Sequence, residues 1–311
     1  MPRPLRDASN LVGVTIVVRG GSIAMADITK LTDDERVVVD EYHRLYYPFF
    51  RDTTWLGITA WKCPFDLFVY QELIFELQPD LIIECGTADG GSAVFLASIC
   101  ELAGHGEVVT IDIRDLDLPR CPRVSYWQGE TLSTDVLTRL ESLVNGRESV
   151  MVILDDDHTR DHVLDELRTY KRFVTPGSYI VVEDTNINNH PVFPEFGPGP
   201  MEAVETFLRE SSEFGIDRSR EKFFLSFNPN GFLRKNGTNR CLPGRSARGF
   251  LNPERAETLA LQAQQIKSLE AQLERESAAL HSVLNSKGWK WLNRLRDART
   301  RAQRAVPWWS G

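Results

Sequence analysis

Cysteine is scarce in this sequence, and long apolar runs are absent. The five cysteines stand far apart and none forms a C-x-x-C pair: Cys63, Cys85, Cys100, Cys121 and Cys241. Zinc sites and disulfide frameworks use closer or paired spacing, so we expect free thiols in a reducing compartment. No stretch approaches the ~18 consecutive apolar residues of a membrane-spanning helix, so no such helix is expected.

The chain also lacks the excess of positive charge that is typical of nucleic-acid-binding proteins. It has 36 Lys and Arg against 44 Asp and Glu, a formal net charge of −8, so no nucleic-acid partner is expected. A hydrophobic content of 42% is enough for a sizeable core. With about 150 residues per domain as a guide, 311 residues indicate one large domain or two.

Residues 1–30 form a variable N-terminal segment without a strong pattern. Its apolar run "LVGVTIVV" (11–18) follows two arginines, as in a signal peptide, but Arg19 ends it after eight residues. No small-residue cleavage site follows at once, so the pattern disfavours export. Met25 is an alternative start, and we expect a cytoplasmic protein.

Residues 31–248 alternate between strand-like and helix-like segments. The capping box "TDDE" (32–35) opens one helix, and Pro64 begins a second that ends before Pro79. Five apolar runs then read as strands separated by helices, at 80–85, 107–113, 123–127, 149–155 and 178–184. This alternation predicts an α/β fold, a mostly parallel sheet with helices on both faces. "KFFLSF" (222–227) and "GFLRK" (231–235), split by "NPN", predict a terminal hairpin.

Residues 249–286 carry a heptad pattern. One apolar position recurs every seven residues, at Leu259, Ile266, Leu273 and Leu280. Leu269 and Val283 occupy the companion position, which Gln262 and Glu276 interrupt. The pattern predicts a coiled coil of about four heptads and a homo-oligomer. A single amphipathic helix packed on the domain is the alternative.

The C-terminal residues 287–311 form a basic tail rich in tryptophan. Within "SKGWKWLNRLRDARTRAQRAVPWW", seven Lys and Arg stand against one Asp. Its apolar residues Trp289, Trp291, Leu292 and Leu295 could enter a lipid interface while the cations face anionic headgroups, which would place the protein peripherally at the inner membrane face. A solvated basic tail is the alternative.

A glycine-bearing loop, "ECGTADGGS" (84–92), follows the first strand of the alternating region. It is not the dinucleotide motif G-x-G-x-x-G, so NAD binding is disfavoured. An acid-x-Gly turn with an acid ending the next strand suits S-adenosylmethionine, because a carboxylate can accept both ribose hydroxyls. The candidates at these strand ends are Glu84, Gly86, Thr87, Gly90, Ser92, Asp112 and Glu130. Alone, the loop could be a tight turn.

Acidic residues follow the next two strands. Asp155 ends one, and Glu183 with Asp184 ends the other, so neighbouring strands would bring three carboxylates to one sheet edge. Such carboxylates repel one another unless a cation such as Mg²⁺ lies between them. The alternative is that Asp157 or Thr159 caps the next helix and the other acids face water.

His158 stands three residues after Asp155. A neutral imidazole there could take a proton from a substrate hydroxyl. A lone histidine is more often structural, and His162, one turn further on, could share its face.

These motifs together resemble the cephalosporin hydroxylase family, which is similar to macrolide-sugar, aminocoumarin-sugar and rhamnosyl O-methyltransferases. The resemblance covers about residues 50–240 and rests on "TWLGITAWKCPFDLFVYQE", "PDLIIECGTADGGSA", "VTIDI", "LDDDHTRDHVLDEL", "VTPGSYIVVEDT" and "FGPGPMEAVETFL". It implies a Rossmann-like class I methyltransferase fold with a seven-stranded sheet. It also implies S-adenosylmethionine at Glu84, Gly86, Thr87, Gly90, Ser92 and Asp112, and Mg²⁺ at Asp155, Glu183 and Asp184.

The resemblance leaves the catalytic base open between two residues. Macrolide-sugar relatives have their proposed base at the position of His158, and aminocoumarin-sugar relatives have theirs at the position of Asp157. We favour His158. The chain has "GET" at 129–131 where relatives often have "GDS". The assignment of Glu130 as a cofactor contact therefore departs from the family pattern.

The function that follows from the resemblance is methyl transfer to a sugar hydroxyl of a bacterial glycan, glycolipid or glycosylated natural product. The C-terminal "SKGWKWLNRLR" resembles an S-x-S-W-R tail of polysaccharide-assembly proteins. The loop 186–200 could close over the acceptor or form a rigid cover, and Lys62 has no assigned role. The alternatives are a non-catalytic subunit of polysaccharide biosynthesis and an oxidative tailoring enzyme, although no facial iron triad or flavin motif is evident.

Overall fold

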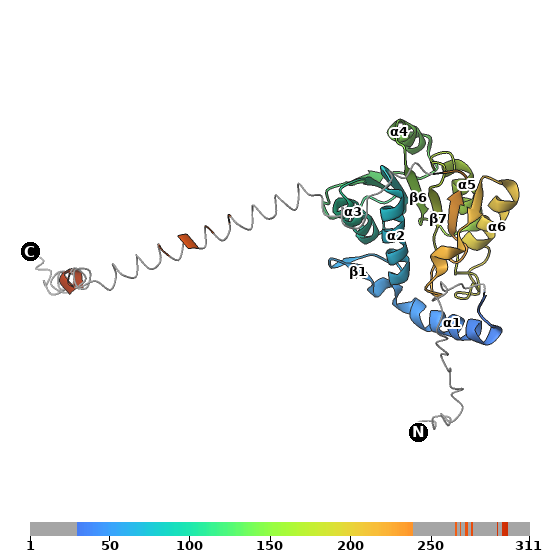
Figure 1. Cartoon of the computed structure of the whole chain (residues 1–311), viewed down its shortest axis with the longest axis horizontal. Helices are drawn as coiled ribbons and strands as arrows, with labels where there is room; N and C mark the ends of the chain where they lie inside the picture. The colour runs from blue at the N-terminus through green and yellow to red at the C-terminus, as the bar shows by residue number, and fades with distance from the viewer. Residues whose placement is uncertain are drawn as a thin grey trace, which may run out of the picture. The chain divides into compact units, whose positions relative to one another are not determined.

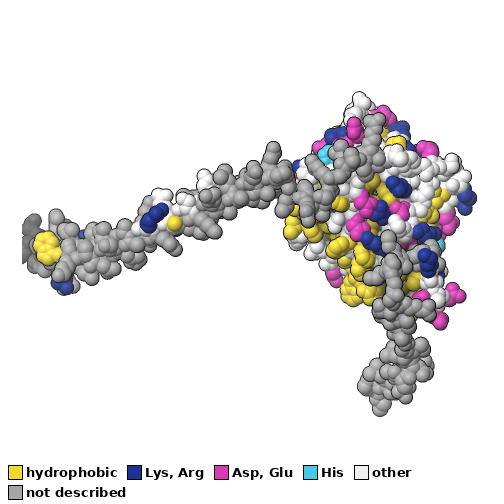
Figure 2. Space-filling view, in the orientation of Figure 1, with side chains coloured by type: hydrophobic (Ala, Val, Ile, Leu, Met, Phe, Trp, Pro, Cys, Tyr) yellow, Lys and Arg dark blue, Asp and Glu magenta, His cyan; other side chains and the backbone are white. Residues whose placement is uncertain are grey.

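The computed structural model describes residues 30–238 and isolated positions between 265 and 297 (Figure 1). The chain divides into two compact units, Met1–Glu101 with His105–Cys241, and Leu102–Gly104 with Leu242–Gly311. On the visible face of the first unit, acidic and basic side chains are interspersed with apolar ones (Figure 2). The first unit holds the sheet and every candidate site residue.

The main sheet has seven strands in the order β5-β4-β3-β6-β7-β9-β8. Five run parallel: β3 (Leu81–Cys85), β4 (Glu107–Asp112), β5 (Val124–Gln128), β6 (Val150–Leu154) and β7 (Tyr179–Val182). The last two, β8 (Phe214–Ile216) and β9 (Phe232–Lys235), pair antiparallel at one edge. The chain runs outward from β3 through β4 to β5 and returns to β6 on the other side of β3. This confirms the predicted fold class and puts the reversal of strand order between β3 and β6, where such sheets bind ligands.

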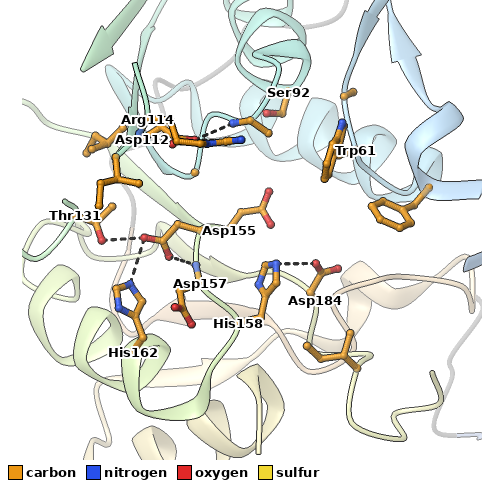
Figure 3. A pocket seen from close by; sticks show the side chains of 18 of the residues that line it. Trp61, Ser92, Asp112, Arg114, Thr131, Asp155, Asp157, His158, His162 and Asp184 are labelled. Atoms are coloured by element: carbon orange, nitrogen blue, oxygen red, sulfur yellow. Dashed lines mark hydrogen bonds and ion pairs between the residues drawn. The ribbon is translucent and has the colours of Figure 1, made fainter. Parts of the chain in front are cut away.

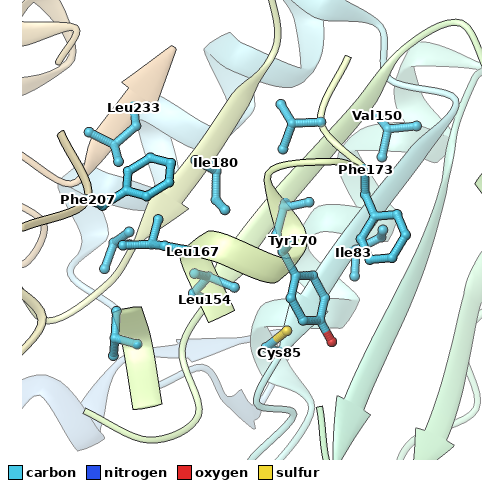
Figure 4. Packing of buried hydrophobic residues seen from close by; sticks show 14 of the residues in the cluster. Ile83, Cys85, Val150, Leu154, Leu167, Tyr170, Phe173, Ile180, Phe207 and Leu233 are labelled. Carbon is cyan, nitrogen blue, oxygen red and sulfur yellow. The ribbon is translucent and has the colours of Figure 1, made fainter. Parts of the chain in front are cut away.

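Helices cover both faces of this sheet, because alternate side chains of a buried strand point in opposite directions. Ile82 of β3 packs with α2 (Pro64–Leu77) and α3 (Gly91–Ala103). Its neighbours Leu81 and Ile83 pack on the other face with α4 (Thr134–Val144), α5 (Arg160–Tyr170) and α6 (Pro200–Glu210). Figure 4 shows this second cluster, in which Tyr170 and Phe207 lie over the strands. The near-continuous apolar strands predicted this two-sided burial.

The N-terminal elements pack beside the sheet. Helix α1 (Asp33–Tyr46) begins as predicted, with Thr32 as N-cap. The Glu35 carboxylate accepts a hydrogen bond from the Thr32 backbone N–H at 2.8 Å. It continues into the 3-10 helix η2 (Tyr47–Asp52) and a short hairpin of β1 (Thr54–Trp55) and β2 (Ile58–Thr59). A second 3-10 helix, η3 (Arg218–Glu221), follows β8. Helix α2 also begins as predicted, at Pro64.

The predicted terminal hairpin is wrong. Residues 222–227 form no strand, and β9 instead pairs with β7 on one side and β8 on the other. Leu225 and Phe227 are buried with Cys63 in a separate small cluster, which holds their segment away from the sheet. Both edges of β9 are already paired, with β7 and with β8, so the apolar residues 222–227 cannot pair with β9.

The predicted coiled-coil seam lies outside the described residues. Five positions of that segment that are described are helical and exposed: Gln265, Ser268, Ala271, Gln272 and Arg275. In the tail, Trp291 and Leu295 are helical and exposed, whereas Trp289 and Leu292 are not described. Among the described residues, no helix has both the length and the apolar character that crossing a bilayer requires. Homo-oligomerisation and membrane contact remain predictions.

Gly86→Ala should destabilise the fold strongly. Gly86 has φ +92°, and a Cβ there would lie 2.0 Å from the Asp155 carbonyl oxygen, so β3 and β6 would have to separate. We expect a loss of about 3 kcal/mol or more in urea unfolding, from backbone strain and overpacking together. Gly146→Ala is the matched control, because its φ is +83° and nothing lies within 4 Å of the added Cβ. This variant should lose only about 1–2 kcal/mol of unfolding free energy. Equal losses in the two variants would contradict the inference that a Cβ at Gly86 clashes with the Asp155 carbonyl.

Candidate active site

A cavity of about 660 Å³ opens at the carboxyl ends of the central strands (Figure 3). Its walls come from the turns after β3, β4, β5, β6 and β7, and from the N-terminal 3-10 helix η2 and the residues after β2. The strand ends thus bring together side chains that are distant in sequence, from Ser92 and Asp112 on one side to His158 and Asp184 on the other. This is the position predicted for ligand binding in such a sheet.

Asp112, at the end of β4, anchors one side of the cavity. Its Oδ2 accepts hydrogen bonds from the backbone N–H groups of Thr87 (3.2 Å) and Ala88 (3.1 Å). Arg114 donates to both carboxylate oxygens, Nε to Oδ1 at 3.0 Å and Nη2 to Oδ2 at 2.9 Å. Burial opposes ionisation, but these donors outweigh it and lower the pKa of Asp112 below its ordinary value. Asp112 is therefore an ionised hydrogen-bond acceptor that these donors fix in position at the cavity wall.

The predicted cofactor residues divide into two groups. Gly86, Ser92, Asp112 and Glu130 line the cavity. Glu84, Thr87 and Gly90 lie behind that wall. The Thr87 hydroxyl bonds the Thr110 hydroxyl at 2.8 Å, and Gly90 faces Leu118 and Pro119.

Glu84 is fully buried, and neither of its carboxylate oxygens has a hydrogen-bond partner within the described part of the chain. Burial raises its pKa, although the charge of Lys62 opposes the shift. Glu84 thus lies buried at the start of the glycine loop, where the charge of Lys62 acts on it.

Asp155, His158 and Asp184 form a compact group on the other side of the cavity. One ligand atom from each lies within 4.8 Å of the other two, and His158 Nε2 is 3.2 Å from Asp184 Oδ2 (Figure 3). Of the predicted metal triad, Asp155 and Asp184 line the cavity. Glu183 lies behind them, with its Oε1 2.6 Å from the Tyr70 hydroxyl and 2.9 Å from Lys62 Nζ.

Lys62 is the site residue whose role the sequence did not reveal. Its side chain is 2% exposed, and its ammonium contacts both Asp155 Oδ2 and Glu183 Oε1. Burial alone would lower its pKa, but Asp155 and Glu183 more than offset that and raise it, so the side chain is charged. The available signal was a lysine two residues before a proline-initiated apolar helix, because a charge that packs beside such a helix needs a partner.

The carboxylates of this region outnumber the described cations near them. Asp155, Glu183, Asp184 and Glu84 face only Lys62 and His158. Burial, with the neighbouring acids, raises the pKa of Asp155 to about 6 and of Glu183 to about 7, and also raises that of Asp184. The pKa of His158 is raised by Asp184 and Asp155, against the effect of burial. A divalent cation at Asp155 and Asp184 would relieve this excess of negative charge, so the donor set fits such an ion.

The three consecutive aspartates have different neighbours. Asp155 faces the carboxylate group, whereas Asp156 accepts from the Thr131 hydroxyl at 2.9 Å and lies 3.2 Å from His162 Nε2. Asp157 Oδ1 accepts the backbone N–H of Thr159 at 2.7 Å, which forms an Asx turn before α5. Asp157 also lines the cavity, so a ligand can reach its carboxylate although one oxygen is engaged in the turn.

The predicted cover loop, residues 186–200, contributes Ile187, Phe193 and Phe196 to the cavity wall. Glu202 ties the loop to α6 by accepting from Asn188 Nδ2 at 2.9 Å and lying 3.0 Å from His190 Nε2. Its other oxygen accepts the Gly199 N–H at 2.7 Å. These bonds favour the rigid cover over the closing loop.

Lys62→Met should destabilise the protein in a pH-dependent way. The substitution leaves the buried Glu183 and the partly buried Asp155 without their cation, at a cost of about 3–5 kcal/mol near neutral pH. Without the ammonium, their pKa values rise further above the unfolded values, so the folded state binds more protons and stability recovers as pH falls below about 7. Urea unfolding at about pH 8 and about pH 5.5 measures both effects.

Lys222→Met is the matched control for that experiment. Lys222 pairs with Glu72 at 2.5 Å, but both side chains are roughly a third exposed. Its loss should cost at most about 1 kcal/mol, with little pH dependence. If Lys62→Met lowers the free energy of unfolding no more at about pH 8 than at about pH 5.5, the electrostatic role of Lys62 is contradicted.

Comparisons with known proteins identify the family of this chain. The family described as Rhamnosyl O-methyltransferase/CmcI matches residues 48–236. The rhamnosyl O-methyltransferase of Mycobacterium tuberculosis (strain ATCC 25618 / H37Rv) is 41% identical over 209 residues, which cover 64% of this chain and 85% of that protein. The rhamnosyl O-methyltransferase of Mycobacterium leprae (strain TN) is 38% identical over 205 residues, covering 63% and 90%.

Among solved structures, the apo structure of CmcI-N160 has a TM-score of 0.47 at 22% identity, covering 60% of this chain and 78% of that one. The family predicted from the motifs is confirmed by the sequence relatives and by a family match that spans more than half of the chain. The protein therefore belongs to the Rhamnosyl O-methyltransferase/CmcI family of O-methyltransferases.

Proposed function

We propose that this protein transfers a methyl group from S-adenosylmethionine to a sugar hydroxyl, with the help of a divalent cation. The observation that carries the proposal is one cavity with two chemically distinct sides. Asp112 and the glycine loop lie on one side, and Asp155, His158 and Asp184 lie on the other. A methyl donor and a cation-bound hydroxyl could then meet within a single site.

The cofactor side has the groups that an adenosyl ligand needs. Gly86 leaves the backbone open to close approach, since its position has no room for a side chain. Asp112 offers two acceptor oxygens for ribose hydroxyls, and Ser92 and Glu130 add polar groups nearby. Arg114, which now bonds both Asp112 oxygens, would move aside, and its side chain is 57% exposed and free to do so.

The cation side combines oxygen donors with a base. Asp155 and Asp184 would hold Mg²⁺ or a similar ion, and Glu183 supports them from behind through Lys62. A divalent cation in this position would lower the pKa of an acceptor hydroxyl. His158, held 3.2 Å from Asp184, would accept the proton from that hydroxyl. The acceptor oxygen would then bond to the methyl carbon as the carbon–sulfur bond breaks.

The sugar acceptor is proposed from two lines of support. The named relatives are rhamnosyl O-methyltransferases. The cavity wall also holds several aromatic rings, which suit the apolar faces of a sugar or an attached apolar group: Tyr47, Phe50, Trp61, Phe193 and Phe196. A glycan, a glycolipid and a glycosylated natural product all meet this description.

Methyl transfer should require both the cation and Asp155. Labelled S-adenosylmethionine is incubated with a panel of rhamnosylated and other bacterial glycosides, with and without EDTA. We expect labelled product with added Mg²⁺, loss of turnover with EDTA, and recovery on adding Mg²⁺ in excess. Asp155→Ala should also be inactive. Turnover that is insensitive to EDTA would contradict the role of the cation, and full activity of Asp155→Ala would contradict the assigned site.

His158 should matter more than Asp157 for the chemical step. His158→Gln removes the proposed base and should lower kcat by about 10²–10⁴-fold with little change in cofactor affinity. Asp157→Asn should lower kcat less than about tenfold, because its carboxylate is already engaged with the Thr159 N–H. Steady-state kinetics with calorimetric binding of S-adenosylhomocysteine measure both. The reverse order of effects would reassign the base to Asp157.

A further inference from the structure

A second group of potential metal ligands lies beside the first. Asp156 from the turn after β6, with His162 and Glu166 from α5, each offer one ligand atom within 4.8 Å of the others. His162 Nε2 is 3.2 Å from Asp156 Oδ2 and 3.7 Å from Glu166 Oε1. His162 and Glu166 stand four residues apart on α5, so their side chains lie on the same face of the helix.

Glu166 is the unusual member of this group. It is fully buried, and neither of its oxygens has a hydrogen-bond partner within the described part of the chain. The hydroxyls of this region bond elsewhere, that of Tyr170 to the Thr131 carbonyl at 2.7 Å and that of Thr131 to Asp156 at 2.9 Å. His162 Nε2 lies 3.7 Å from Glu166 Oε1, beyond hydrogen-bond distance. A buried carboxylate without hydrogen bonds is costly, so it indicates a partner that protein side chains do not supply.

A single imidazolium does not balance the charge here. If His162 is protonated, its one positive charge faces the two negative charges of Asp156 and Glu166. A dication bound by the two carboxylates and a neutral imidazole would leave no net charge. The donor atoms are also suitably spaced, because ligands about 2.0–2.2 Å from a tetrahedral ion lie roughly 3.3–3.6 Å from one another.

We propose that Asp156, His162 and Glu166 form a second metal site, which takes a Zn²⁺-type ion. One nitrogen and two oxygen donors suit zinc, cobalt or manganese better than magnesium, which prefers oxygen ligands alone. The site thereby differs in chemistry from the proposed Mg²⁺ position at Asp155 and Asp184.

The site opens toward the cavity. Asp156 and His162 line the cavity wall next to Thr131, whereas Glu166 closes the site from behind. An ion held by three protein ligands would keep one position open, and because Asp156 and His162 line the cavity, a polar group of the acceptor could reach it. The ion would also fix Asp156, and with it the turn that carries Asp155, Asp157 and His158.

Metal binding, measured without turnover, tests the proposal. Metal-free full-length protein is titrated with Zn²⁺ by calorimetry at about pH 8, and Co²⁺ is added in parallel to follow the visible absorption of a nitrogen-ligated ion. Glu166→Gln and His162→Gln should each weaken this binding at least about 100-fold, because each removes a direct ligand. Zinc binding should also release about one proton, since the neighbouring carboxylates raise the pKa of His162 to about 10.

Two controls identify the site. Asp165→Asn, which removes an exposed carboxylate next to Glu166 on the same helix, should bind Zn²⁺ like the unchanged protein. Asp184→Asn removes a ligand of the proposed Mg²⁺ position and should leave the cobalt spectrum of the second site unchanged.

Two results would overturn the proposal. The first is Zn²⁺ binding that Glu166→Gln and His162→Gln leave unchanged. The second is that these variants change no Zn²⁺ binding and that NMR shows the His162 imidazole still protonated at about pH 8 in the presence of Zn²⁺. That result would mean that an imidazolium bridges the two acids. Neither result bears on methyl transfer, whose test rests on turnover and on Asp155.

Discussion

The buried ammonium of Lys62 is the contact on which the rest of the site depends. It joins the start of α2 to the ends of β6 and β7, by binding Asp155 and Glu183 at once. These carboxylates would otherwise repel each other and the nearby Glu84 in an environment that water does not screen. The ammonium lies behind the cavity wall and contacts both Asp155 and Glu183, whereas Asp155 and Asp184 line the cavity itself. The protein thus compensates part of the buried charge internally and leaves the remainder to a ligand.

The direction of the strands explains why these groups meet at all. In five parallel strands, every carboxyl end reaches the same edge of the sheet, so Asp112, Asp155 and Asp184 converge although they come from different parts of the chain. The reversal of strand order between β3 and β6 opens the space in front of them. Gly86 is needed at that point because the backbones of the β3 and β6 turns touch there.

The sequence predicted the features that depend on local pattern and on strand direction. Alternating strands and helices predicted the fold, and the capping box at Thr32 predicted a helix start. The acids at strand ends predicted three carboxylates that line the cavity, Asp112, Asp155 and Asp184. It did not predict the orientation of Glu183, because the choice between facing the cavity and facing Lys62 depends on a residue more than a hundred positions away. The false hairpin has a similar cause: only the pairing of β9 with both β7 and β8 excludes residues 222–227 from the sheet.

The three aspartates 155–157 show how a short acidic run can serve several purposes. Successive side chains leave the chain in different directions after β6, so Asp155 joins Lys62, Asp156 joins His162 and Asp157 forms the turn before α5. Their shared backbone means that a ligand held by one of them restrains the other two. An ion at Asp156 would therefore affect the position of Asp155 and His158 without touching them, and an ion at Asp155 would affect Asp156 in return. Because such coupling is reciprocal, the turn after β6 would link the two proposed metal sites.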